Sequence, residues 1–235
     1  MMFVLGGCAR GSIAASSDDA GTGGAPRLDA GGGADARSGT QPADAMADAM
    51  IDAPPPPPPD ACIPTTTQLL VNASLDAAPQ GTGWAQQVIR AGFPLITPMD
   101  NASGPTEHTA PYKAWLGGFT GSGVTDVLSQ DVAIPPLTSA LVLSGFFAVR
   151  TDDSTGAVYD TASVALTQTS GAPIATAFTV SNQTPQAPWA PFSHAFAQNV
   201  SGQTVRLRLS STNDAGYPTS FYFDTLALTA THGCP

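Results

Sequence analysis

The fold of this chain is decided by one stretch, Thr204-Val205-Arg206-Leu207-Arg208-Leu209-Ser210, in which polar and apolar residues alternate. An alternation of period two places every apolar side chain on one face of a β-strand, as in a strand buried on one side. Similar segments, bounded by turn residues, occur at 68–72, 112–118, 126–134, 141–149, 162–166, 174–180, 192–197 and 221–229. No window shows sustained helical periodicity. We therefore predict an all-β domain, a jelly-roll β-sandwich of eight or nine antiparallel strands.

The last predicted strand contains a change of parity. Phe221 and Phe223 are followed by Leu226 and Leu228, so a regular strand would place the two pairs on opposite faces. One extra residue in the strand returns both pairs to the same face. We therefore predict a β-bulge at Asp224-Thr225.

Residues 9–61 differ in composition from the rest of the chain. They contain no aromatic residue, and they include Asp-Ala repeats over 43–53 and six consecutive prolines at 54–59. Because no periodic apolar set offsets the entropy of ordering them, we expect a disordered linker. The prolines should form a stiff polyproline II spacer of roughly 19 Å, at ~3.1 Å per residue. We expect the jelly-roll domain to occupy 62–235.

Residues 1–8 end in Leu5-Gly6-Gly7-Cys8, which resembles a bacterial lipobox. The resemblance implies a signal peptide that is cut before Cys8, which then carries acyl chains worth roughly 0.8 kcal/mol per buried CH₂. Export signals run about 15–30 residues, and only Met1 to Gly7 precede this cysteine. Either the true start lies further upstream or the motif is accidental. We expect an exported lipoprotein at the outer membrane or cell surface.

The chain is acidic, with a formal net charge of −10 at pH 7. It has no cluster of Lys and Arg, which argues against nucleic acid as a partner and against electrostatic binding to an anionic membrane. No further apolar run is long enough to span a bilayer. We expect a monomer that contacts the membrane only through its lipid anchor.

The two remaining cysteines, Cys62 and Cys234, flank the predicted domain. In an exported protein, such a pair indicates a disulfide that ties the two ends of the domain together. The alternative is two free thiols. Closing the loop between Cys62 and Cys234 would stabilise the domain by roughly 5 kcal/mol.

Several segments resemble the accessory jelly-roll domains of secreted bacterial peptidases and glycosidases. The resemblance covers roughly 66–230 and rests on Tyr112–Gly118, Asp126–Gln130 with Ile134-Pro135, Tyr159-Asp160, Gly202–Arg208 and Thr219–Asp224. Those domains have the galactose-binding-like fold, which includes many carbohydrate-binding modules and also modules without a sugar site. Because the shared positions are mostly core and turn positions, the resemblance implies the fold more than a ligand.

The resemblance also implies a structural Ca²⁺ ion between the first and last strands. Asp76, at the end of Asn72-Ala73-Ser74-Leu75-Asp76, matches one ligand position, and Asp224 matches another. Thr225 stands where a second Asp is usual. Carboxylate and carbonyl oxygens suit Ca²⁺. The alternative is that Asp76 and Asp224 only cap turns or the bulge.

Two aromatic residues in proline-containing loops, Trp189 and Tyr217, are the candidate ligand-binding residues. An exposed ring can stack on the apolar face of a sugar. Such rings can also fold back onto the core, which is the alternative for both. Trp84 and Trp115 are expected to pack inside.

Motifs of common enzymes are absent from the sequence, including the nucleophile elbow, the zinc-protease motif, the phosphate-binding loop and Cys-x-x-Cys. Glu107 and His108 are neighbours that could transfer a proton, but a solvated loop is the more common setting. We therefore expect a surface-displayed binding module, carbohydrate-binding or adhesive, rather than an enzyme. The alternatives are a structural envelope lipoprotein that engages a protein partner and, less favoured, a small hydrolase.

Overall fold

The computed structural model describes residues 62–234 except 89, 91, 99–103 and 122. Cys8 and the predicted linker therefore lie outside the described residues. Every regular element in the described part is a strand, and none of it is a helix that could cross a membrane. The strands are β1 (Thr65–Gln68), β2 (Ala85–Gln87), β3 (Ile96–Thr97), β4 (Lys113–Gly117), β5 (Val124–Ala133), β6 (Thr138–Thr151), β7 (Thr161–Gln168), β8 (Pro173–Ser181), β9 (Ala190–Ala195), β10 (Thr204–Asn213) and β11 (Thr219–His232).

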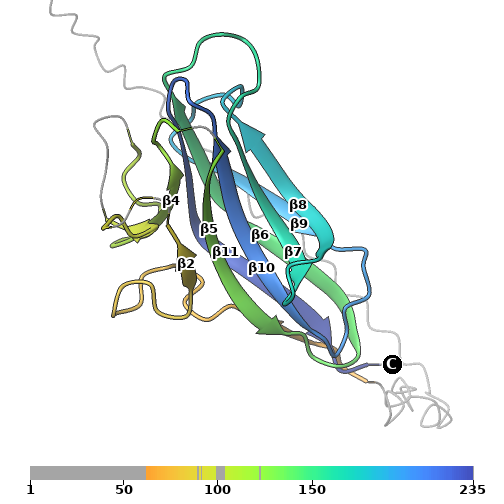
Figure 1. Cartoon of the computed structure of the whole chain (residues 1–235). Coiled ribbons are helices and arrows are strands. Elements are labelled where there is room, and N and C mark those ends of the chain that lie inside the picture. Colours follow the sequence, from red (N-terminus) through yellow and green to blue (C-terminus); the bar gives the residue numbers. More distant parts are fainter. Residues whose placement is uncertain (1–61, 89, 91, 99–103, 122, 235) are drawn as a thin grey trace, which may run out of the picture. The chain divides into compact units, whose positions relative to one another are not determined.

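The strands form two antiparallel sheets that pack face to face (Figure 1). The first sheet has the order β3-β4-β11-β6-β9, with β1 also paired to β11. The second sheet has the order β2-β5-β10-β7-β8. The predicted all-β sandwich is confirmed.

The core follows from the alternation seen in the sequence. On β10, Val205, Leu207 and Leu209 are buried between the sheets. Arg206 points outward instead and forms an ion pair with Asp131 on the neighbouring β5 at 2.6 Å. One face of each long strand thus supplies the core, and the other carries polar side chains or binds loops.

Strand boundaries near the start of the domain differ from the prediction. The segment 68–72 is not a strand beyond Gln68, because Gln68 Oε1 accepts the backbone N–H groups of Leu69, Leu70 and Leu228. Leu69 N–H still donates to the carbonyl of Leu228 at 2.8 Å, but Leu228 N–H donates to the Gln68 side chain instead of the backbone, and a turn follows in which Asn72 has a φ of 53°. The two short strands β2 and β3 were not predicted, since three and two residues cannot show an alternation.

The predicted bulge in β11 is confirmed. Pairing with β6 jumps from Asp224↔Phe146 to Ala227↔Ser144, and Thr225 has a φ of 50°. As a result, the Phe pair before the bulge and the Leu pair after it are all buried.

The predicted disulfide is also confirmed. Cys62 and Cys234 are joined with a Cα–Cα distance of 5.6 Å. They lie at the end of the sandwich where β1 pairs with the C-terminal residues of β11, which we call the disulfide end. At the opposite end, the loop end, Thr219 pairs with Thr151, so the β6–β7 loop and the β10–β11 turn lie together there (Figure 1).

Trp84 and Trp115 occupy different environments. Trp84 is buried in the core, as predicted. Trp115 is only half-buried, because it alternates with the core residues Ala114 and Leu116 on β4 and so faces out of the sandwich. There its ring stacks on Tyr222 with a centroid distance of 6.0 Å. The prediction that Trp115 packs inside is therefore wrong, since its parity on β4 places it on the outer face.

Candidate ligand-binding site

Tyr217 lies in the β10–β11 turn, and 61% of its surface is exposed. It directly precedes Pro218, whose carbonyl accepts the N–H of Asp152 at 3.3 Å. This hydrogen bond joins the turn to the residue that follows β6. The ring of Tyr217 is thus presented to solvent by a turn that is anchored to its neighbour.

A polar pocket of about 80 Å³ lies beside this turn. It is lined by Gly118, Arg150, Thr151, Asp152, Gln186, Pro218 and Ser220. Arg150 Nη1 donates to the carbonyls of Val149 and Ala187, both at 2.8 Å, and Gln186 Nε2 donates to the carbonyl of Thr151 at 3.2 Å. These bonds hold the polar side chains in one arrangement.

The β6–β7 loop at the same end presents a second exposed ring. Tyr159 is 51% exposed, and its neighbour Val158 is exposed as well. Asn182 orders this loop, because its Oδ1 accepts the N–H of Tyr159 at 3.1 Å and its Nδ2 donates to Asp153 and Ala157. Hydrogen bonds from the side chain and the backbone N–H of Thr155, and a smaller contribution from Asn182, lower the pKa of Asp153. Sequence reasoning missed Tyr159 as a site residue, although its place between a turn and a strand was a usable signal.

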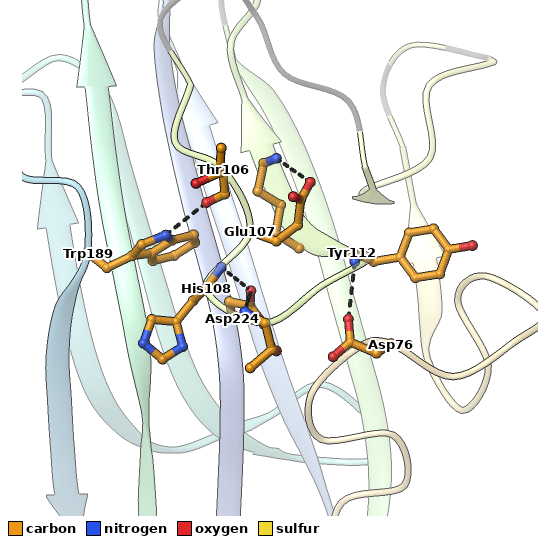
Figure 2. Close-up of polar contacts among 9 residues, drawn as sticks. Asp76, Thr106, Glu107, His108, Tyr112, Trp189 and Asp224 are labelled. Carbon is orange, nitrogen blue, oxygen red and sulfur yellow. Dashed lines mark hydrogen bonds and ion pairs between the residues drawn. The ribbon is translucent and has the colours of Figure 1, made fainter.

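Trp189 has a different environment from Tyr217. Its ring is half-buried, and its Nε1 donates to the carbonyl of Thr106 at 2.9 Å (Figure 2). The ring of His108 lies edge-on to it at 5.9 Å. Trp189 therefore anchors the segment 104–112, and its role in ligand binding stays a prediction.

Asp224 and Asp76 bind this same segment (Figure 2). Asp224 Oδ2 accepts the N–H groups of His108 at 2.8 Å and Thr109 at 3.0 Å. Asp76 Oδ1 accepts the N–H of Tyr112 at 3.1 Å. The two carboxylates thus fix successive parts of one loop against the outer face of the first sheet.

Both oxygens of Asp224 already have hydrogen-bond donors. The second oxygen of Asp224 also accepts hydrogen bonds, from Thr109 Oγ1 at 3.2 Å and from the N–H of Thr225 at 2.6 Å. A cation on Asp224 would have to displace N–H donors that already point at it. Among the described residues, no group of three or more His, Cys, Asp and Glu is placed to hold a metal ion. Calcium binding by Asp76 and Asp224 stays a prediction.

Asp224 is fully buried, and burial raises the pKa of its carboxyl group above the usual value. The hydrogen bonds from Thr109, Thr225 and His108 oppose this shift but do not cancel it. Asp224 is therefore an acid whose charge is costly in the folded protein.

Glu107 and His108 have separate partners. Glu107 pairs with Nζ of the fully buried Lys113 at 3.0 Å (Figure 2). His108 Nδ1 shares a hydrogen bond with Thr225 Oγ1 at 2.8 Å, and the imidazole stacks on Phe146 at 3.7 Å. Both side chains thus hold the loop in place, and their contacts give no sign of joint proton transfer.

No protein-family model and no curated protein matches this sequence. Solved structures that are similar to it include carbohydrate-binding modules and adhesin domains. TmCBM61 in complex with β-1,4-galactotriose has 13% identity and a TM-score of 0.46 over 69% of this chain and 97% of its own. The K3 cleaved adhesin domain of Lys-gingipain from Porphyromonas gingivalis has 9% identity and a TM-score of 0.42, over 70% and 99%. The family 16 carbohydrate-binding module-2 has 19% identity and a TM-score of 0.40, over 68% and 98%. Because the identities are this low and the TM-scores are below 0.5, these structural similarities support no inference about a ligand.

Proposed function

We propose that this protein is a non-catalytic, surface-displayed module that binds carbohydrate at its loop end. The observation that carries the proposal is the polar pocket lined by Pro218, the residue that follows the exposed Tyr217. A sugar ring has an apolar face that stacks on an aromatic ring, and hydroxyl groups that need hydrogen-bonding partners. Arg150, Asp152 and Gln186 in the pocket can supply such partners.

The size of the pocket supports a particular mode of binding. At about 80 Å³ it is well below the roughly 300–1,000 Å³ of pockets that enclose a small ligand. A sugar would therefore lie on the surface against Tyr217 and place only a hydroxyl or hydroxymethyl group in the pocket. Such an open site suits one unit of a longer glycan, because the rest of the polymer can extend past it.

The position of the site in the fold supports display away from a surface. The chain enters the domain at Cys62, at the disulfide end, whereas Tyr217 lies at the loop end. If the protein is anchored through Cys8, the linker attaches at the end far from the proposed site. We propose that the protein is exported and held at the outer membrane or cell surface in this orientation.

A pull-down of the full chain with a panel of insoluble polysaccharides tests the proposal. We expect at least one to retain the wild type, and Tyr217→Ala to reduce retention without changing the melting temperature. Leu137→Ala is the matched control, because Leu137 is also an exposed large apolar residue but lies at the disulfide end. Failure of every polysaccharide to retain the wild type, or equal retention of Tyr217→Ala, would contradict the proposal.

A second candidate is a structural envelope protein that engages a protein partner. The observation in its favour is that Val158, Tyr159 and Tyr217 are all exposed on loops at the same end. Exposed apolar side chains gathered at one end of a domain also suit a protein interface. Cross-linking in cells that traps one envelope protein, lost in Tyr159→Ser, together with no binding to any glycan, would favour this candidate.

A further inference from the structure

Three buried polar side chains lie inside the sandwich near its loop end. Asp160, Ser211 and Asn213 are each only 1% exposed. Ser211 and Asn213 continue on β10 the inward-facing series of Val205, Leu207 and Leu209, so their side chains point between the sheets. The core is apolar along most of β10 and becomes polar only over these last residues.

Each of the three side chains has an oxygen atom without a hydrogen-bonding partner: Asp160 Oδ2, Ser211 Oγ and Asn213 Oδ1. The orientation of the Asn213 amide is fixed, because its Nδ2 donates to the carbonyl of Thr219 at 3.0 Å. The other oxygen of Asp160 accepts the N–H of Asp214 at 2.8 Å. The unpartnered atoms of Asp160 and Asn213 are therefore acceptors, and no donor in the described part of the chain reaches them.

The strand register brings the three residues together. On β10 and β7, Ser211 is opposite Ala162 and Thr212 is opposite Thr161. Asp160 directly precedes β7, and its Oδ1 accepts the N–H of Asp214, the residue after Asn213, so Asp160 lies beside the end of β10. Ser211 is two residues before Asn213 and so shares its face of the strand.

A positive charge would offset the cost of burying the Asp160 carboxylate. A buried carboxylate is costly unless it is paired, and within the described residues Asp160 forms no ion pair with Lys, Arg or His. Asp126, which is opposite Ser211 on β5, has partners of its own, among them the N–H of Gly117 at 2.9 Å. A bound water could donate hydrogen bonds here, but it would not neutralise charge.

We propose that Asp160 Oδ2, Asn213 Oδ1 and Ser211 Oγ bind a hard divalent cation, Ca²⁺. Carboxylate, amide and hydroxyl oxygens are hard ligands that suit it, and backbone carbonyls or waters complete its six to eight ligands. The ion joins Asp160, which ends the β6–β7 loop, to Asn213, the last residue of β10 before the β10–β11 turn. It therefore fixes the relative position of the two segments that carry Tyr159 and Tyr217. This inference does not depend on carbohydrate binding, and it concerns different residues from Asp76 and Asp224.

Asp160→Asn distinguishes a site that binds a cation from one that does not, because the two predict different results. The new amide keeps an oxygen for the N–H of Asp214 and can donate to the unpartnered Asn213 Oδ1. Without a cation, this change removes a buried charge, supplies a missing donor and should raise the melting temperature. With a cation, it removes the charged ligand. We then expect Ca²⁺ affinity to fall by more than about 100-fold, since second-shell partners alone cost about 10–100-fold.

The experiment measures Ca²⁺ binding and melting temperature for the metal-stripped full chain, with CaCl₂ as the probe. We expect the wild type to bind Ca²⁺ and to melt at a higher temperature when it is added. Asp160→Asn should show neither effect. Ser211→Ala should weaken binding by about tenfold while keeping the fold, because it removes only a buried hydroxyl without a partner. Asp76→Asn should bind Ca²⁺ like the wild type.

Three results would overturn the proposal. The first is a wild type that neither binds Ca²⁺ nor changes its melting temperature, with Asp160→Asn more stable, which would indicate a buried water only. The second is Ca²⁺ binding that survives both Asp160→Asn and Ser211→Ala. The third is Ca²⁺ binding that is lost in Asp76→Asn but kept in Asp160→Asn, which would place the ion at the other carboxylates.

Discussion

Removing the Cys62–Cys234 disulfide should lower the stability of the domain substantially. The bridge closes a loop with a sequence separation of 172 residues. In the chain-entropy model a loop of this length restricts the unfolded chain by about 5 kcal/mol. The perturbation is the double variant Cys62→Ser, Cys234→Ser, made together with Cys8→Ser so that no third thiol can form a new bridge.

The structure indicates that the measured loss will be somewhat smaller. The strand next to the bridge, β1, is exposed over all its residues, so it contributes backbone hydrogen bonds but little burial. Without the disulfide, β1 can fray, and the folded state regains some conformational freedom. We therefore expect a loss of roughly 3–5 kcal/mol in the free energy of unfolding.

Urea unfolding followed by tryptophan fluorescence measures this loss by linear extrapolation. The two single Cys→Ser variants are the control. Each removes the same bridge, so its free energy of unfolding should fall by as much as that of the double variant. Hydrogen exchange should show faster exchange in Thr65–Gln68, where β1 frays. A loss below about 1 kcal/mol would refute the reasoning, as would single variants whose losses add up in the double.

Three further predictions concern the loop on the first sheet and the anchor. Because burial raises the pKa of Asp224, its contribution to stability is present below the unfolded pKa and is lost as pH rises through the folded pKa. The unfolding free energy of the wild type relative to Asp224→Asn should therefore fall as pH rises above about 4, the usual pKa of Asp, and a flat difference would contradict this. Glu107→Gln removes a charge that faces the buried Lys113 and should lower the free energy of unfolding in urea by roughly 2–4 kcal/mol. This is less than for a wholly buried pair, because Glu107 is 18% exposed. An unchanged unfolding curve would show that the pair contributes little. Cys8→Ser should move the chain from the detergent phase to the aqueous phase in phase partitioning of cells, and an aqueous wild type would count against lipidation.

The fold could be predicted because its evidence is local. The alternation in β10 and the change of parity in β11 are both contained in single segments, and each determines which side chains are buried. Two cysteines that flank the domain were likewise enough to predict the bridge between Cys62 and Cys234. The strand predictions that failed are of two kinds. Strands β2 and β3 are too short to show an alternation, and the end of β1 depends on one competing side-chain acceptor, Gln68.

The candidate site could be predicted only in part. The sequence identified Tyr217 as an aromatic residue in a turn, but it gave the same evidence for Trp189, whose ring instead anchors a loop distant in sequence. The partners of the polar residues are set by pairings between distant strands. Asp160 and Asp214, for example, are hydrogen-bonded only because β7 and β10 are neighbours in the second sheet. A single sequence does not reveal such pairings.

The most direct test of the central claim is to compare the affinities of Tyr217→Ala and Trp189→Phe for the best-retained glycan. If Tyr217 is the stacking ring, its truncation should lower the affinity by about tenfold or more, equivalent to about 1–3 kcal/mol, and leave the melting temperature unchanged. Trp189→Phe should instead lower the melting temperature, since it loses the hydrogen bond to Thr106, and leave the affinity unchanged. Full affinity in Tyr217→Ala together with lost affinity in Trp189→Phe would contradict the account and place the glycan at Trp189.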